Sequence, residues 1–200
     1  MEIVIQKYEE PFSLGGFSIE DVLSLVKAAY RERIKDGIRF ETLDFTLEDY
    51  RQELNQGNNI FFGAIENGSL FGVARLEKER ILCNFAVLPE AQGKHVGSLL
   101  LQALTNYGKT IGLDHIYSYT HIKAQSSVKC HIHNGFNIIS VVRDNGYWSY
   151  LFRCQLKKHW FWSNKMCCKM RYYFSYVKKH MESLVEDGRA RNRQVKTDSA

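Results

Sequence analysis

The segment from residue 81 to residue 121 constrains the fold more than any other part of the chain. It begins with an apolar run of strand type at 81–88 and closes with a second run at 115–121, which mixes β-branched and aromatic residues. Between these runs, apolar side chains recur at helical spacing over residues 96–111. A strand, a helix and a strand in this order place both strands parallel in one sheet, through a right-handed crossover.

Further strands are indicated on both sides of this unit. The runs 60–65 and 70–76 flank Asn67-Gly68, a dipeptide typical of tight hairpins because both residues tolerate positive φ. The sequence therefore predicts an α/β fold with a central sheet of about seven strands, mixed antiparallel and parallel, and flanking helices. The predicted strands are 3–5, 60–65, 70–76, 81–88, 115–121, 136–142 and 147–154.

Two helix starts carry capping boxes, in which a Ser or Thr oxygen accepts a backbone N–H and an acid three residues later suits the positive helix end. Ser18 with Asp21, and Thr46 with Asp49, match this pattern. The predicted helices run from Ser18 to Gly37, from Thr46 to about Gln56, from Gly93 to Gly112, and from a cap at Ser126-Ser127 to Asn134-Gly135.

Composition excludes several classes of protein. Hydrophobic residues make up 44% of the 200 residues and charged residues 24%, as in ordinary soluble proteins. The five cysteines show no CxxC spacing, which disfavours zinc ribbons and disulfide frameworks and favours a reduced compartment. Neither a long apolar span nor a signal-peptide pattern is found. We therefore expect a cytoplasmic protein without a metal site.

Charge divides the chain into unlike parts. Residues 1–152 carry 15 Lys and Arg against 18 Asp and Glu, whereas residues 153–200 carry 12 against 4. Within 156–180, seven basic residues and seven aromatic residues occur without an acid. The sequence thus predicts a folded domain at 1–155, a helical basic-aromatic extension at 156–186 and a disordered tail at 187–200.

The role of the extension stays open at this point. Its aromatic side chains favour packing on the domain, or on a second copy of the chain as a homodimer. Its positive charge also suits peripheral contact with an anionic membrane, while nucleic acid is the least favoured partner.

The turn that follows residues 81–88 indicates an anion-binding site. Gly93 and Gly97 lie at the expected start of a helix, where unpaired backbone N–H groups favour phosphate, and Lys94 adds a positive charge. The spacing matches neither the P-loop nor the dinucleotide fingerprint. Taken alone, such a turn is equally typical of a tight structural corner.

The surrounding residues make this turn more specific. The stretch Gln92-Gly93-Lys94-His95-Val96-Gly97-Ser98 follows a strand that ends in Val-Leu-Pro-Glu, and it resembles the acyl-CoA-binding motif of the GNAT superfamily of N-acetyltransferases. Gln92 and Gly97 match the outer positions of that motif, while His95 stands where glycine is usual. Asn134-Gly135-Phe136 resembles the Gly-Phe at a helix-to-strand turn of that family. The resemblance covers residues 3–154.

The resemblance implies a set of site residues. Main-chain groups of Phe85 and Val87 would bind the pantetheine arm like an added strand, and residues 92–98 would hold the pyrophosphate. His131 occupies the position of the family's general acid, a tyrosine. The implied cofactor-binding residues are Phe85, Val87, Gln92, Gly93, Lys94, His95, Val96, Gly97, Ser98 and Gln125.

The function implied by the resemblance is an N-acetyltransferase that moves an acetyl group from acetyl-CoA to a primary amine, a small molecule or a protein, by direct attack in a ternary complex. A backbone N–H from the Val87 region would polarise the carbonyl. The alternative is an acyl-CoA-binding regulatory module with little or no catalysis.

Other interpretations of single residues stay open. His131 is as consistent with a structural histidine as with an acid, and Cys130 is better explained as a core residue than as a nucleophile. The candidate bases are Glu77, Glu79 and His121.

Overall fold

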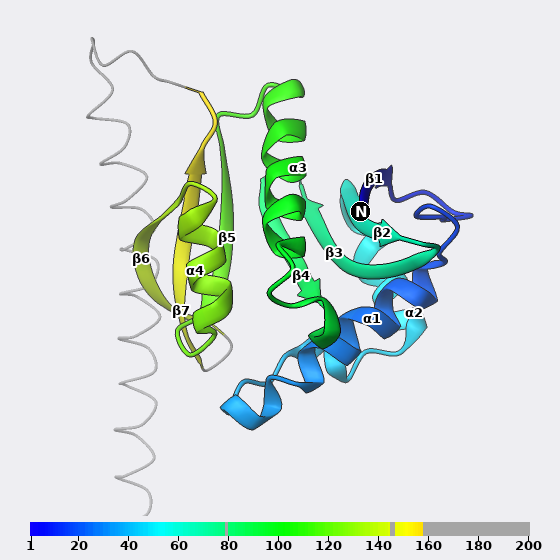
Figure 1. Cartoon of the computed structure of the whole chain (residues 1–200), viewed down its shortest axis with the longest axis horizontal. Helices are drawn as coiled ribbons and strands as arrows, with labels where there is room; N and C mark the ends of the chain where they lie inside the picture. The colour runs from blue at the N-terminus through cyan, green and yellow to red at the C-terminus, as the bar shows by residue number, and fades with distance from the viewer. Residues whose placement is uncertain (79, 145–146, 158–200) are drawn as a thin grey trace, which may run out of the picture. The chain divides into compact units, whose positions relative to one another are not determined.

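A computed structural model describes residues 1–78, 80–144 and 147–157 (Figure 1). A seven-stranded mixed sheet runs through this region, in the order β1-β2-β3-β4-β5-β7-β6. Its strands are β1 (Glu2–Lys7), β2 (Asn59–Glu66), β3 (Ser69–Glu77), β4 (Ile81–Val87), β5 (His115–His121), β6 (Phe136–Asp144) and β7 (Tyr147–Gln155).

The predicted hairpin and the predicted parallel pair of strands are both confirmed. Strands β2 and β3 form the antiparallel hairpin, β4 adds to it as a third antiparallel strand, and β4 pairs with β5 in parallel. In the described part of the chain, however, β4 and β5 are paired at two positions alone, Ile81 with Tyr117 and Leu82 with Ser118. The two strands then part, so the sheet opens into a gap between its two halves.

Four α-helices lie on the two faces of the sheet within the described residues. Helix α3 packs on strands β1 to β5 and α4 on β6, while α1 packs on β3 and β4 (Figure 1). The helices are α1 (Ile19–Arg31), α2 (Leu47–Asn55), α3 (Val96–Thr110) and α4 (Gln125–His133), with short 3₁₀ segments η1 (Ile34–Asp36), η2 (Glu41–Leu43) and η3 (Pro89–Ala91).

Alternation along the strands builds a separate core on each face. Phe62 of β2 and Ala74 of β3 point into the core that contains α3, whereas their neighbours Phe61 and Val73 point into the core that contains α1 and α2. Because side chains alternate along a strand, β2 and β3 each contribute residues to both cores. Because each face is covered, the gap between β4 and β5 is walled by helices rather than open on both sides.

Local signals mark several helix ends, with three corrections. The helix predicted from Gly93 begins at Val96. Both predicted capping boxes form, at Ser18 with Asp21 and at Thr46 with Asp49. The cap predicted at Ser126-Ser127 is wrong, because α4 begins one residue earlier and Ala124 precedes it without a side-chain cap. Gly37, with φ of 70°, ends η1 rather than α1.

The predicted extension at 156–186 and tail at 187–200 lie outside the described residues, except for the first two residues of the extension. Among the helices of the described chain, none is long and apolar enough to cross a membrane.

Candidate active site

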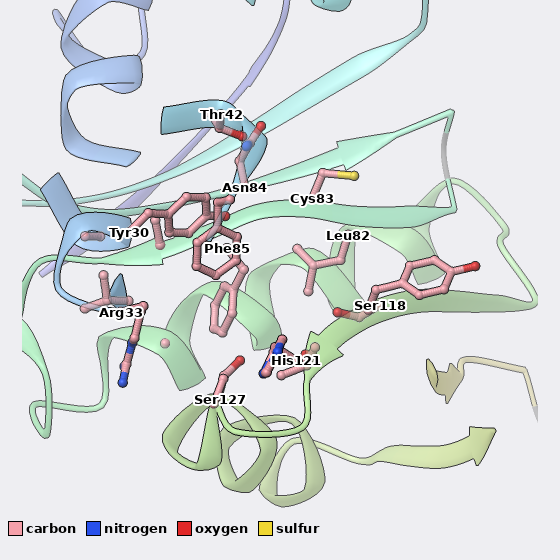
Figure 2. Close-up of a pocket in the computed structure, with 18 of the residues that line it drawn as sticks. Tyr30, Arg33, Thr42, Leu82, Cys83, Asn84, Phe85, Ser118, His121 and Ser127 are labelled. Carbon is pink, nitrogen blue, oxygen red and sulfur yellow. The ribbon is translucent and has the colours of Figure 1, made fainter. Parts of the chain in front are cut away.

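A cavity of about 1060 Å³ occupies the gap where β4 and β5 part (Figure 2). Its walls come from β4, from β5, from the turn before α3, from α4, and from the end of α1 with the segment that follows it. One end of the cavity is therefore the glycine-rich turn, and the other contains charged residues from α2 and β3.

A bulge in β4 shapes the middle of this cavity. Asn84 has φ of 42°, a left-handed conformation that Asn tolerates better than most residues, and the β3–β4 register shifts beside it. The Tyr50 hydroxyl, from a fully buried side chain of α2, donates a hydrogen bond of 3.1 Å to Asn84 Oδ1. The bulge lies just beyond the last described pairing of β4 with β5, and Tyr50 contacts it there.

The turn before α3 leaves backbone donors free for a ligand. Gly93 and His95 have φ of 79° and 63°, and α3 begins directly afterwards at Val96. In the described structure no side chain caps this helix, so the N–H groups of its first turn face the cavity end without a capping oxygen. His95 thus adopts the conformation that glycine favours, and the turn forms despite the substitution.

Nine of the eleven residues predicted for the site line the cavity, and two do not. The Gln125 amide donates to the Ile122 carbonyl oxygen at 2.8 Å, and Ala124, Ser126 and Ser127 take its place on the cavity wall. Lys94 is exposed and does not line the cavity. The residues that line the cavity are Phe85, Val87, Gln92, Gly93, His95, Val96, Gly97, Ser98 and His131.

Gly97 lies where a side chain would crowd two neighbouring elements. A Cβ at this position would lie 3.2 Å from the Phe85 ring of β4 and 3.2 Å from Cys130 Sγ of α4. Both contacts are closer than side chains normally tolerate. Glycine at position 97 therefore lets α3 approach β4 and α4 at the cavity end.

Burial raises the pKa of the Cys130 thiol, as expected for a core residue.

His131 lies in the cavity wall and is 1% exposed. Its Nε2 atom is 2.9 Å from Ser118 Oγ of β5, and its Nδ1 atom is 2.8 Å from the carbonyl oxygen of Ser127. Burial lowers its pKa to about 4, against the opposing effect of the Ser127 carbonyl. The ring is neutral at pH 7, and the role of general acid stays a prediction.

The far end of the cavity carries paired charges. Arg75 of β3 is 3% exposed, donates to the Glu53 carboxylate of α2 and lies 3.8 Å from the Glu77 carboxylate. The Cys83 thiol donates to Glu77 at 3.4 Å, and burial raises its pKa to about 12. Glu53 and Glu77 both line the cavity, and Glu77 also pairs with Lys78, whose Nζ atom is 3.3 Å from its carboxylate.

His121 is less suited to act as a base than its sequence position indicates. Its Nδ1 atom accepts the backbone N–H of Lys123 at 3.1 Å, so the proton of the neutral ring is on Nε2. Burial, and then the Lys123 charge, lower its pKa. The lone pair of the neutral ring is already engaged. Glu79, the third base predicted, lies outside the described residues.

Sequence reasoning missed several residues that the fold brings to the cavity. Tyr30 of α1 lies beside Asn84 and Phe85, while Ser118 reaches the cavity from β5 on the opposite side (Figure 2). Arg33 donates to Ser126 Oγ at 2.9 Å and thereby connects the end of α1 to the start of α4. The sequence marks none of these residues directly. Its one related signal is Asn84, a polar residue inside the otherwise apolar strand β4, at the position of the bulge.

Comparison with known proteins places this geometry in a family. The sequence profile of the acetyltransferase (GNAT) family matches residues 19–136, whereas no curated protein matches the chain in sequence. PaiA N-acetyltransferase of Thermoplasma acidophilum, solved in complex with coenzyme A, superposes with a TM-score of 0.59 at 20% identity, over 78% of this chain and 99% of that chain.

Two further solved structures share the fold at similarly low identity. YncA of Salmonella typhimurium, solved with its cofactor acetyl-CoA, has a TM-score of 0.58 at 14% identity and covers 82% of this chain and 99% of its own. A GNAT-family acetyltransferase of Staphylococcus aureus Mu50 has a TM-score of 0.59 at 18% identity, over 78% and 100%. Since the family profile spans more than half of the sequence, including β4 and the start of α3, the chain belongs to the GNAT family of acetyltransferases.

Proposed function

We propose that the protein moves an acetyl group from acetyl-CoA to a primary amine, by direct attack of the amine on the thioester. The observation that carries this proposal is the gap beside β4, which ends at the uncapped start of α3. An extended pantetheine arm fits a gap left by a missing strand pairing, and a diphosphate fits a helix start. The PaiA and YncA structures contain coenzyme A and acetyl-CoA, which supports the same cofactor here.

The cofactor would extend from the α3 turn along β4 toward Leu82. Backbone N–H groups of residues 96–98 would hold the diphosphate, together with the turn at Gly93. One main-chain group is already engaged, because the Gln92 amide donates to the Val87 carbonyl oxygen at 3.3 Å. We therefore assign the pantetheine contacts to the main chain around Phe85 and the bulge, where β5 has no paired residue in the described structure.

The acceptor would enter at the end that contains Glu53 and Glu77. Glu53 and Glu77 can each accept a proton from an ammonium group through water, although Arg75 and Lys78 already pair with them. His121 is the weaker candidate, because its Nδ1 lone pair is engaged by the backbone. The rate would then come mainly from alignment of amine and thioester, and from polarisation of the carbonyl by β4 N–H groups at the bulge.

An acceptor screen tests the activity. Purified full-length protein would be incubated with acetyl-CoA and a panel of primary amines: an alkylamine, a diamine, an arylethylamine, an aminoglycoside, an amino-acid amide and a peptide with a free N-terminus. Amine-dependent release of CoA thiol, with the acetylated amine detected by mass spectrometry, is the expected result. Tight acetyl-CoA binding without turnover on any amine would instead favour the regulatory module.

A charge substitution at Ser98 tests the cofactor site separately from turnover. Ser98 is the third residue of α3, and its Oγ accepts the Asn134 side-chain amide at 3.1 Å. Ser98→Asp keeps that acceptor and favours the helix start by up to about 1 kcal/mol, yet it repels a diphosphate. We expect calorimetry to show CoA affinity reduced by about tenfold or more, with an unchanged or higher melting temperature.

Ser98→Asn is the matched neutral control, and it should bind CoA within about threefold of the wild type. Gly97 is a poor site for such a test, because any side chain there meets Phe85 and Cys130. Equal CoA affinity of the Asp and Asn variants would refute the assignment of the diphosphate to the α3 turn.

A further inference from the structure

A chain of two hydrogen bonds runs through the cavity wall from β5 to α4. Ser118 and His131 are 2% and 1% exposed, and the hydroxyl of the one contacts Nε2 of the other at 2.9 Å. On the far side of the ring, Nδ1 lies 2.8 Å from the Ser127 carbonyl oxygen. The Ser118 hydroxyl, the His131 ring and the Ser127 carbonyl oxygen thus form one hydrogen-bonded chain.

The positions of the hydrogens follow from the chemistry of the partners. A carbonyl oxygen can only accept, so the single N–H of the neutral imidazole is on Nδ1 and points to Ser127. Nε2 is then an acceptor, and the Ser118 hydroxyl must donate to it. In the resting protein His131 therefore has no hydrogen to offer the cavity, while the Ser118 oxygen keeps its lone pairs.

Aromatic side chains hold the imidazole in this orientation. The Phe152 ring of β7 stacks on it at 5.0 Å between centroids, and the rings of Phe136 and Phe85 meet it edge-on at 5.2 and 5.3 Å. Aromatic side chains from β4, β6 and β7 thus surround the His131 ring. A ring confined in this way keeps Nε2 directed at Ser118.

Ser118 occupies the point where a reacting group would lie. It pairs with Leu82 in the last described pairing of β4 with β5, and it lines the cavity directly beyond that pairing (Figure 2). A pantetheine arm that runs from the α3 turn back along β4 brings its thioester toward the same point. This placement rests on the proposed function.

We infer that Ser118 and His131 form a proton relay that carries a proton from the attacking amine to the departing CoA sulfur. The amine nitrogen first bonds to the thioester carbon, which leaves positive charge on nitrogen and negative charge on oxygen. Ser118 Oγ takes a proton from that nitrogen, while its own hydrogen moves to His131 Nε2.

The second half of the relay restores the resting state. The oxyanion re-forms the carbonyl, the C–S bond breaks, and its electron pair leaves on sulfur. The sulfur takes the hydrogen from Ser118 Oγ, which recovers a hydrogen from His131 Nε2. The products are the amide and the CoA thiol. One hydroxyl can serve both atoms, because nitrogen and sulfur are bonded to the same carbon in the adduct.

Single and double variants test the relay. With acetyl-CoA and the best amine of the panel, Ser118→Ala and His131→Gln should each lower kcat by about 100-fold, the scale of proton-transfer catalysis, with little change in KM for acetyl-CoA. The double variant should be no slower than either single one, because the two residues act as a unit. Ser118→Thr, which keeps the hydroxyl, should recover most of the activity.

A solvent isotope measurement separates the relay from a structural role. In mixtures of light and heavy water, two protons moving together produce a curved dependence of kcat on deuterium fraction in the wild type, which should become linear in Ser118→Ala. Thr105→Val, which removes a buried hydroxyl of α3 bonded to the Gln102 carbonyl oxygen, should keep the curve. Thermal melts and CoA calorimetry on every variant identify losses that come from misfolding.

Two outcomes overturn the inference, and they are distinct. If the wild type transfers acetyl groups but folded Ser118→Ala keeps kcat within threefold and the same curvature, the relay is wrong and the proposed function stands. If the wild type releases no CoA thiol with any amine, the proposed function fails in the wild-type assay itself and the relay fails with it.

Discussion

Tyr50 on α2 donates its phenolic hydrogen to Asn84 on β4 at 3.1 Å, and Tyr30 on α1 also hydrogen-bonds the Asn84 side chain, so both helices contact the bulge. The Tyr50 phenol is fully buried, so its bond is shielded from water. The carbonyl-polarising groups proposed for catalysis lie on the same bulge. We therefore expect both the stability and the proposed activity to depend on this contact between residues 34 positions apart.

Tyr50→Phe tests this dependence. Removal of the hydroxyl leaves Asn84 Oδ1 without this donor, so the free energy of unfolding should fall by about 1–2 kcal/mol and kcat should fall with it. Chemical denaturation and the CoA-thiol assay measure the two effects. Tyr107→Phe is the control, since the Tyr107 ring packs edge-on against Phe62 outside the cavity. A loss of stability without any loss of kcat would contradict the link between the bulge and catalysis.

His95 should tolerate glycine better than a β-branched residue. It holds φ of 63° and ψ of 7° directly before α3, a conformation that costs most L-residues about 1–2 kcal/mol. His95→Gly should be stabilising or neutral and should keep or raise CoA affinity, whereas His95→Val should lose at least about 1 kcal/mol and bind CoA less tightly. Melting temperatures and calorimetry on the pair check this order. The reverse order would mean that the His95 ring itself contacts the ligand.

Acid should destabilise the protein partly through His131. Its pKa is about 4 in the folded chain, below the ordinary histidine value of about 6.5, so between these values the unfolded chain binds a proton that the folded chain does not. Stability contributed by this group is complete above pH 6.5 and falls by about 1.4 kcal/mol per unit as the pH drops toward 4.

The comparison with His131→Gln isolates this contribution. Denaturant unfolding of both proteins at several pH values should show the difference in stability shrink by about 3 kcal/mol between pH 6.5 and pH 4, in the direction that favours the variant at low pH. Parallel curves for the two proteins would show that the pKa of His131 is the same in the folded and unfolded chains, so that burial does not disfavour the charged ring.

Local features of the sequence predicted much of the fold. The capping boxes at Ser18 and Thr46, the hairpin at Asn67-Gly68 and the 81–121 crossover each depend on residues close together in the chain, and all four are confirmed. The glycine-rich turn could be placed for the same reason. Short-range chemistry specifies such elements before any tertiary contact forms.

Long-range geometry explains what the sequence could not supply. The Ser118–His131 contact joins β5 to α4, and the Asn84 bulge depends on a partner in α2; neither follows from spacing along the chain. The prediction that Gln125 lines the site is wrong for a related reason, because it depended on where α4 begins. Because α4 starts at Gln125, its side chain turns back to Ile122, and Ser126 and Ser127 reach the cavity instead.

If a ligand binds in the gap between β4 and β5 as proposed, binding and folding become parts of one equilibrium. Two paired positions are all that β4 and β5 share in the described chain, so a molecule in the gap would supply surface and hydrogen bonds that the polypeptide lacks. Anything that binds the folded state alone raises its stability by mass action, by about 2.7 kcal/mol at a hundredfold excess over Kd. Inside a cell, the abundance of such a protein would follow the supply of the molecule that completes its sheet.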